Sequence, residues 1–190
     1  MSVAYESHSG PWTVDDVLAL PEDPRHRIEL VGGALLMTPN PGVPHQRASY
    51  RLRDLLQRAA DACGADVEVL EAVNLPVPEG LLIPDIVVVN ADFAADAAVT
   101  VDPHEVLVVI EILSPSTRIT DLKTKPALYA AAGIPAYWRL DLTPTPRLTT
   151  SELRQGGYVD GLTALAGATT RTERPFPFDI DPADLARAPR

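Results

Sequence analysis

The sequence contains a single cysteine, no long hydrophobic run and fewer basic than acidic residues, and each of these shortages excludes a class of protein. Because Cys63 is the only cysteine, the chain forms no intrachain disulfide and no cysteine-rich zinc site. The longest apolar runs, such as residues 106–110, are far shorter than the roughly 20 residues that a membrane-spanning helix needs. Residues 1–12 have neither a basic region nor a continuous apolar stretch, so we expect no signal peptide and a cytoplasmic location.

Positive charge is also scarce, because 16 Lys and Arg residues face 26 Asp and Glu residues, which gives a formal net charge of −10. Neutralising phosphates normally requires clustered Lys and Arg, so this charge argues against a large nucleic-acid interface. A local basic stripe can coexist with an acidic remainder, and a nuclease site is itself acidic. The net charge therefore argues against a large contact surface for nucleic acid, but it does not exclude nucleic acid as the substrate.

The length and composition suit one globular domain with one core, since 46% of the 190 residues are hydrophobic and 22% are charged. The sequence has no internal repeat, low-complexity tract or convincing interdomain linker. We therefore expect a single domain over residues 1–190, with a core at about 13–141 and a β-rich C-terminal extension over 142–190.

The first forty residues predict a short helix and a hairpin. Thr13 is a suitable cap for a helix over residues 13–20, which two prolines then end. Residues 27–39 read as two short strands around a pair of glycines, which a tight turn favours. Glu29 lies on the first of these strands.

Residues 44–63 have apolar side chains at helical spacing, which predicts a long helix with one buried face that ends at Gly64. The apolar neighbours of Cys63 indicate a core position for it rather than a reactive thiol. The other face of this helix carries basic side chains at intervals of four and seven residues, which lie on one side of a helix: Arg47, Arg51 and Arg58.

The rest of the chain is rich in strands. Apolar or alternating segments cover residues 67–77, 81–90, 105–113 and 136–142. A short amphipathic helix over residues 125–132 precedes the last of them and ends at a glycine. Because the buried strands are too apolar to face water, helices must cover them. We therefore predict an α/β fold, a mixed β-sheet flanked by helices.

Two carboxylates interrupt these apolar strands. Asp85 follows Pro84 at the start of one strand, and Glu111 lies near the end of the next. An unpaired buried carboxylate is costly, so such groups find a cation, a hydrogen-bond donor or a metal ion. Oxygen ligands with room for water and phosphate suit magnesium or manganese. The spacing alone leaves two interpretations open, a metal site or a turn cap at Asp85 with an arginine partner for Glu111.

Four segments around these acids resemble one protein family. The most specific is EILSPSTRITDLKTKPALYAAAGIPAYWRLD, and it is accompanied by PDIVVV, IELVGGALL and PHQRASYRLRDLL. Over about residues 13–141 the chain closely resembles the Uma-two family of endonucleases. The resemblance implies the restriction-endonuclease-like, PD-(D/E)XK nuclease fold, in which Asp85 is the aspartate that follows proline and Glu111 is the second acid.

One position departs from the wider superfamily pattern, which has a lysine two residues after the second acid, because Leu113 stands there. The Uma-like branch resembles variants in which a lysine of the following helix serves instead, and the matching residue is Lys125, with Lys123 as its rival. Both lysines also suit an exposed helix surface. Since Pro126 is tolerated only in the first turn of a helix, we expect Thr124 to be the N-cap.

Other residues match the family pattern as well. Glu29 resembles an acid that completes the metal site in related nucleases, although an exposed edge-strand position suits it equally. His45 and Gln46 resemble a pair at the start of the long helix that orients a phosphate or caps the helix. Asp121 and Tyr129 match too, and we expect structural roles for them.

The resemblance implies an endodeoxyribonuclease that hydrolyses DNA phosphodiester bonds with Mg²⁺ or Mn²⁺. Asp85 and Glu111 are the expected metal ligands, and Lys125 and Glu29 complete the catalytic set. The candidates for phosphate contact are His45, Gln46, Arg47, Arg51 and Lys123. A small nuclease that cuts both strands commonly works as a symmetric dimer, so we expect a homodimer. The alternatives are a catalytically degenerate DNA-binding or interaction domain with the same fold and a hydrolase of a smaller phosphate ester.

Overall fold

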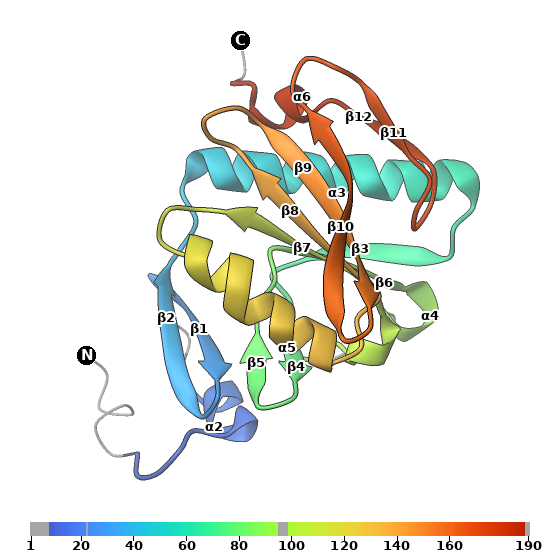
Figure 1. Cartoon of the computed structure of the whole chain (residues 1–190). Coiled ribbons are helices and arrows are strands. Elements are labelled where there is room, and N and C mark those ends of the chain that lie inside the picture. Colours follow the sequence, from blue (N-terminus) through green and yellow to red (C-terminus); the bar gives the residue numbers. More distant parts are fainter. Residues whose placement is uncertain (1–7, 22, 95–98, 189–190) are drawn as a thin grey trace.

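A six-stranded mixed sheet crosses the molecule in the computed structural model, which describes residues 8–21, 23–94 and 99–188 (Figure 1). The strand order is β10-β9-β8-β7-β6-β3. All neighbours are antiparallel except β7 and β8, which are parallel. The strands are β3 (Val67–Glu71), β6 (Ile86–Asn90), β7 (Val106–Leu113), β8 (Ala136–Asp141), β9 (Arg147–Arg154) and β10 (Gly157–Leu165). The predicted α/β fold with a mixed sheet is confirmed.

Helix α3 (Val43–Cys63) covers one face of this sheet (Figure 1). Its buried stripe packs against side chains of β6, β7 and β8 and includes Ala48, Leu52, Leu56 and Ala60. Gly64 ends the helix in the left-handed conformation, with a φ of 69°, which glycine adopts without a steric penalty. The predicted core position of Cys63 is wrong. Its side chain is exposed, because it is the last residue of the helix and lies beyond Ala60, the last buried one.

Helix α5 (Lys125–Ala131) packs on the opposite face and connects β7 to β8. A parallel pair of strands requires such a crossover. Tyr129 of this helix packs among the side chains that β6 and β7 direct to this face, such as Val87 and Val109. Thr124 stands at the predicted N-cap position of the helix but does not cap it. Its backbone is helical and its side chain makes no capping bond, because a π-helical turn, η2 (Thr120–Thr124), leads directly into α5.

A smaller sheet with the order β2-β1-β5-β4 lies near the same face as α5 (Figure 1). Its strands are β1 (His26–Val31), β2 (Ala34–Pro39), β4 (Leu75–Val77) and β5 (Gly80–Leu82). β1 and β2 form the predicted hairpin around Gly32 and Gly33, both with positive φ. The single strand expected over 67–77 is instead divided into β3 and β4, and Ala72 between them has a φ of 53°. Leu75 and Leu82 pack with Tyr129 in one apolar cluster.

Short elements complete the fold. Helix α2 (Val14–Leu18) begins after Thr13, whose side chain makes the predicted cap, and it packs on the small sheet through Val17. Helix α4 (Ala91–Ala94) and η1 (Pro103–Glu105) precede β7. β11 (Thr170–Thr172) pairs with β12 (Phe178–Ile180), and α6 (Pro182–Ala186) follows near α3. None of the helices in the described part of the chain has the length and apolar character that crossing a membrane requires.

Candidate active site

Strand register brings Asp85 and Glu111 to the same place. Ile86 of β6 pairs with Ile110 of β7, and the two acids are the next residues in this antiparallel register. Side chains alternate between the faces of a sheet, and Ile86 and Ile110 pack toward α3. Asp85 and Glu111 therefore point to the other face, toward α5 and the small sheet. The two acids are thus neighbours in the register, on one face of the sheet.

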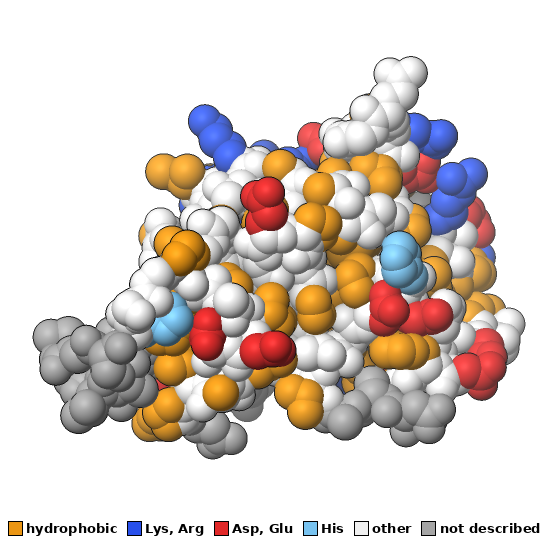
Figure 2. All heavy atoms as spheres, turned by 90° about the horizontal axis from the view of Figure 1, so that it is seen from below, with side chains coloured by type: hydrophobic (Ala, Val, Ile, Leu, Met, Phe, Trp, Pro, Cys, Tyr) orange, Lys and Arg blue, Asp and Glu red, His pale blue; other side chains and the backbone are white. Residues whose placement is uncertain are grey.

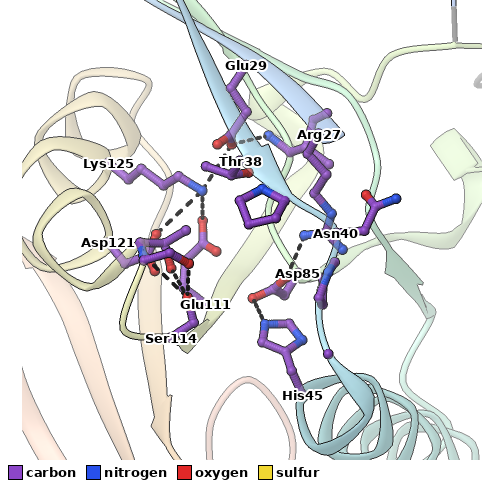
Figure 3. Close-up of a pocket in the computed structure, with 16 residues that line it drawn as sticks. Arg27, Glu29, Thr38, Asn40, His45, Asp85, Glu111, Ser114, Asp121 and Lys125 are labelled. Atoms are coloured by element: carbon purple, nitrogen blue, oxygen red, sulfur yellow. Dashed lines mark hydrogen bonds and ion pairs between the residues drawn. The ribbon is translucent and has the colours of Figure 1, made fainter. Parts of the chain in front are cut away.

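Asp85 is held by three donors from three separate elements, and Figure 3 shows two of them, Arg27 and His45. Arg27 Nη1 lies 2.6 Å from Oδ1, His45 Nε2 lies 3.0 Å from Oδ2, and the backbone N–H of Ile112 donates to Oδ2 at 2.8 Å. Burial by itself raises the pKa of Asp85, but the hydrogen bond and charge of His45 and the charge of Arg27 outweigh it. The pKa therefore lies below its usual range, and this carboxylate is ionised.

Glu111 shares one oxygen between two donors from α5. Lys125 Nζ lies 3.1 Å from Oε1, and the hydroxyl of Tyr129 donates to the same oxygen at 2.7 Å. Burial is the main cause that raises the pKa of Glu111 to about 8, and the neighbouring carboxylates add to the rise. Lys125 opposes the rise without cancelling it. The carboxyl group of Glu111 therefore keeps its proton to a higher pH than an exposed glutamate does.

Lys125 is the centre of the acidic cluster (Figure 3). Besides Glu111, its ammonium lies 3.0 Å from Glu29 and 3.5 Å from Asp121, and the residue is only 4% exposed. Burial lowers the pKa of Lys125, but the three carboxylates outweigh this effect and raise it. Glu29 is fixed in turn by the backbone N–H of Ile83, which donates to it at 2.8 Å. The lysine thus remains a cation and links the small sheet to the strand that carries Glu111.

A cavity of about 220 Å³ opens between these groups. Its charged lining consists of four carboxylates, two cations and a histidine, namely Glu29, Asp85, Glu111, Asp121, Arg27, Lys125 and His45. His45 Nδ1 is buried and has no hydrogen-bond partner among the described residues. The hydroxyl-bearing turn that follows β7 completes the wall, with Ser114, Ser116 and Thr117.

The donor set fits a divalent cation. The cavity lining holds four carboxyl groups against two permanent cations, Arg27 and Lys125, so it is rich in the oxygen ligands that such an ion takes. Within residues 8–21, 23–94 and 99–188, no three His, Cys, Asp or Glu side chains are arranged to hold a metal by themselves. Proteins commonly bind Mg²⁺ through one or two carboxylates together with water and substrate phosphates, which requires no such cluster. Asp85 and Glu111, which the family resemblance implies as metal ligands, are two of the carboxylates in this lining.

The two rival lysines are separated clearly by their positions. Lys125 is buried in the cavity, whereas Lys123, two residues earlier in the π-helical turn, is exposed and lies outside it. The helical continuity through Thr124 fixes this difference, because residues two apart on a helix point in different directions.

Several of the predicted phosphate contacts do not reach the cavity. Gln46 donates to the carbonyl of Pro41, and Arg51 donates to three backbone carbonyls in and after α6. Arg58 pairs with Asp54 on the same helix, and Arg47 is not part of the cavity lining. Of the residues on α3, only His45 lines the cavity.

Arg27 is the contact that sequence reasoning missed. It lies two residues before Glu29 on β1, so both side chains point to the same side of the strand. That alternation was visible in the sequence. What was hidden is that Arg27 bridges to Asp85, 58 residues later, across the two sheets.

Comparison with known proteins identifies relatives of the whole fold. The Uma2 family, described as "Putative restriction endonuclease", matches residues 14–186. Among solved structures, the chain is similar to "a putative nuclease belonging to DUF820" from Anabaena variabilis, with 16% identity and a TM-score of 0.68. The match covers 93% of this chain and 92% of that chain, and at this identity it establishes the fold, which is restriction-endonuclease-like. No curated protein matches the chain.

Proposed function

Since the chain belongs to the Uma2 family, described as "Putative restriction endonuclease", we propose that it is a nuclease that hydrolyses DNA phosphodiester bonds with Mg²⁺ or Mn²⁺. Asp85 and Glu111 hold the ion, and Lys125 and Glu29 belong to the catalytic set. When bound, such an ion polarises the scissile phosphate and lowers the pKa of a coordinated water.

The observation that carries the proposal is the position of Lys125. The superfamily pattern has a lysine two residues after the second acid, where this chain has Leu113. Helix α5 instead directs Lys125 back to Glu111, and the two side chains lie 3.1 Å apart. A migrated lysine in contact with the second acid supports a working nuclease site.

The remaining roles follow from charge and contact. Because the pKa of Lys125 is raised, its ammonium keeps its proton, so it stabilises developing negative charge on the phosphate rather than acting as a base. Glu29 holds Lys125 in place through an ion pair, and Tyr129 holds Glu111 through a hydrogen bond. His45 contacts Asp85 through Nε2, which leaves Nδ1 to accept a hydrogen bond from a bound water and so to orient it.

The proposal is tested by incubating supercoiled plasmid with purified protein in Mg²⁺, Mn²⁺ or EDTA. We expect nicked or linear product with either metal and none in EDTA. Asp85→Ala should abolish cleavage, whereas Asp179→Asn should not, since Asp179 is an exposed carboxylate paired with Arg171. Cleavage that persists in Asp85→Ala, or that is lost equally in Asp179→Asn, contradicts the proposed site.

A second candidate is a nuclease-fold domain that binds DNA without cutting it. The observation that favours it is the completeness of the contacts at Asp85, where Arg27, His45 and Ile112 already supply donors to both oxygens. If this candidate is correct, wild-type protein retards duplex DNA in a gel but cleaves none with either metal.

We also propose that residues 1–190 act as one nuclease-like domain, in which 142–190 extend the core of residues 13–141, and that two copies form a homodimer. Two sites related by symmetry suit the cutting of both DNA strands. The strands β9 and β10 support the domain assignment, since they continue the large sheet. Light scattering after size exclusion measures the mass, and a monomeric mass at working concentrations contradicts the dimer.

A further inference from the structure

A second polar pocket of about 310 Å³ lies beside the candidate active site. Strands β8 and β9 and the turn after β7 contribute its arginines: Arg118, Arg139 and Arg147. The turn also separates the two pockets, because Ser114, Ser116 and Thr117 line the first and Leu113 and Arg118 line the second. We propose that this second pocket binds a backbone phosphate of the DNA strand whose neighbouring phosphate occupies the active site.

This inference rests on the proposed function. It explains how a protein with a net negative charge can bind the phosphates of DNA. The active site carries more carboxylates than cations, and the chain as a whole has a net charge of −10. Phosphate binding nevertheless requires local positive charge. The second pocket contains three arginines and two aspartates, so its formal charge is positive.

Other surfaces suit DNA less well. Figure 2 shows a face with acidic and hydrophobic side chains across its middle, while Lys and Arg gather at the upper margin. On α3, Arg51 is bonded to the carbonyls of the α6 region and Arg58 is paired with Asp54. The arginines of the second pocket, in contrast, include Arg139, which pairs with Glu111 in the sheet register.

The arginines of this pocket are fixed in position. Arg118 and Arg147 both donate to one oxygen of Asp141, at 2.9 and 3.2 Å, and Asp141 is 3% exposed. The arginine side chains are 42% and 52% exposed. Among the described residues each guanidinium uses one of its five N–H donors in this way, so the others can face a ligand. One buried carboxylate thus holds two exposed guanidiniums, the group best suited to phosphate oxygens.

The register of the large sheet sets the distance between the pockets. Glu111 of β7 pairs with Arg139 of β8, and Asp141 of β8 pairs with Arg147 of β9. Neighbouring strands are about 4.8 Å apart, so the arginines come one or two strands after Glu111, roughly 5–10 Å across the sheet. Phosphates of one DNA strand recur about every 3.4 Å along the helix axis. A strand cut at Glu111 therefore places one of its next few phosphates at the second pocket.

The test measures binding of a labelled DNA duplex by fluorescence anisotropy in EDTA, over a range of salt concentrations. Arg118→Gln/Arg147→Gln should weaken binding about ten-fold or more at 0.1 M salt and lower the salt slope by about one for each arginine that no longer neutralises a phosphate. The matched control, Arg171→Gln/Arg174→Gln, removes two exposed arginines elsewhere and changes the net charge equally. It should bind within a few-fold of wild type.

A third pair, Arg118→Lys/Arg147→Lys, retains both charges beside Asp141 and should recover most of the binding. Thermal melting shows whether the glutamine pair is folded. If it is not, Arg147→Gln alone leaves Arg118 on Asp141 and should lower the salt slope by about one. Equal losses in the glutamine pair and its control, or no loss in either, overturn the phosphate site.

The outcomes also separate this site from the proposed activity. A wild-type protein that binds DNA through these arginines but does not cleave it removes the nuclease proposal and keeps the phosphate site. A wild-type protein that does not bind DNA removes both.

Discussion

Replacing Lys125 with methionine keeps most of the side chain's length and removes its charge. The structure shows what this change does, because the ammonium lies 3.0 Å from Glu29, 3.1 Å from Glu111 and 3.5 Å from Asp121. The variant leaves three buried carboxylates without their shared cation, and breaking a buried ion pair costs roughly 3–5 kcal/mol of unfolding free energy. A divalent ion in the cavity should restore part of this loss. Cleavage should fall by about 10²–10³-fold, the usual effect of losing one electrostatic stabiliser.

The assay is plasmid cleavage at saturating Mn²⁺, at a temperature where melting curves show the variant to be folded. Lys123→Met is the matched control, since Lys123 is exposed and lies outside the cavity, and it should retain both stability and activity. Lys125→Met combined with Asp121→Asn removes one unpaired charge, so it should regain stability while cleavage stays low. If Lys123→Met abolishes cleavage and Lys125→Met does not, the assignment of the lysine is refuted. Full activity in both single variants and in their combination refutes the migrated lysine altogether.

Three further predictions concern stability. Burial raises the pKa of Asp141, but its hydrogen bonds, above all that from Arg118, outweigh this and hold the pKa below its usual value of 3.8. Its contribution is therefore fully present above that pH and is lost as the pH falls through the lowered pKa. Asp141→Asn should be less stable than wild type in urea at pH 7, and the difference should shrink as the solution is acidified below pH 3.8; a difference that stays constant on acidification contradicts this. Leu52→Ala should cost about 2–5 kcal/mol in the same experiment, since Leu52 is fully buried between α3 and the sheet. Cys63→Ser should stay within about 0.5 kcal/mol of wild type because Cys63 is exposed, and a large loss there refutes that placement.

Most of the fold could be predicted because the spacing of hydrophobic residues agrees with the glycines and prolines that end helices and strands. The long helix ends at Gly64 as expected, and the apolar runs at 86–90 and 106–113 are buried strands. The missing capping bond at Thr124 could not be predicted, because a π-helical turn carries no distinct sequence pattern and removes the need for a cap. Periodicity also failed at Cys63, since it describes which side of a helix is apolar but not how far the covering sheet extends.

The candidate site could be predicted only in its local parts. Asp85 and Glu111 were evident because each is an acid within an apolar strand. The pairing of Asp85 with Arg27 joins two sheets, and the pairing of Asp141 with Arg118 and Arg147 depends on strand register. Neither pairing produces a recognisable spacing of residues in the sequence. The spacing of the arginines on α3 predicted that they share one side of the helix. It could not predict that Arg51 donates to backbone carbonyls in and after α6.

The most direct test of the metal site is an anomalous difference map from crystals soaked in Mn²⁺. The account predicts a peak between the carboxylates of Asp85 and Glu111, with metal–oxygen distances of about 2.1 Å. The same crystals of Asp85→Asn should show a weaker peak or none. A map of the wild-type protein without density at this position, with Lys125 still in contact with Glu111, would contradict the proposed site.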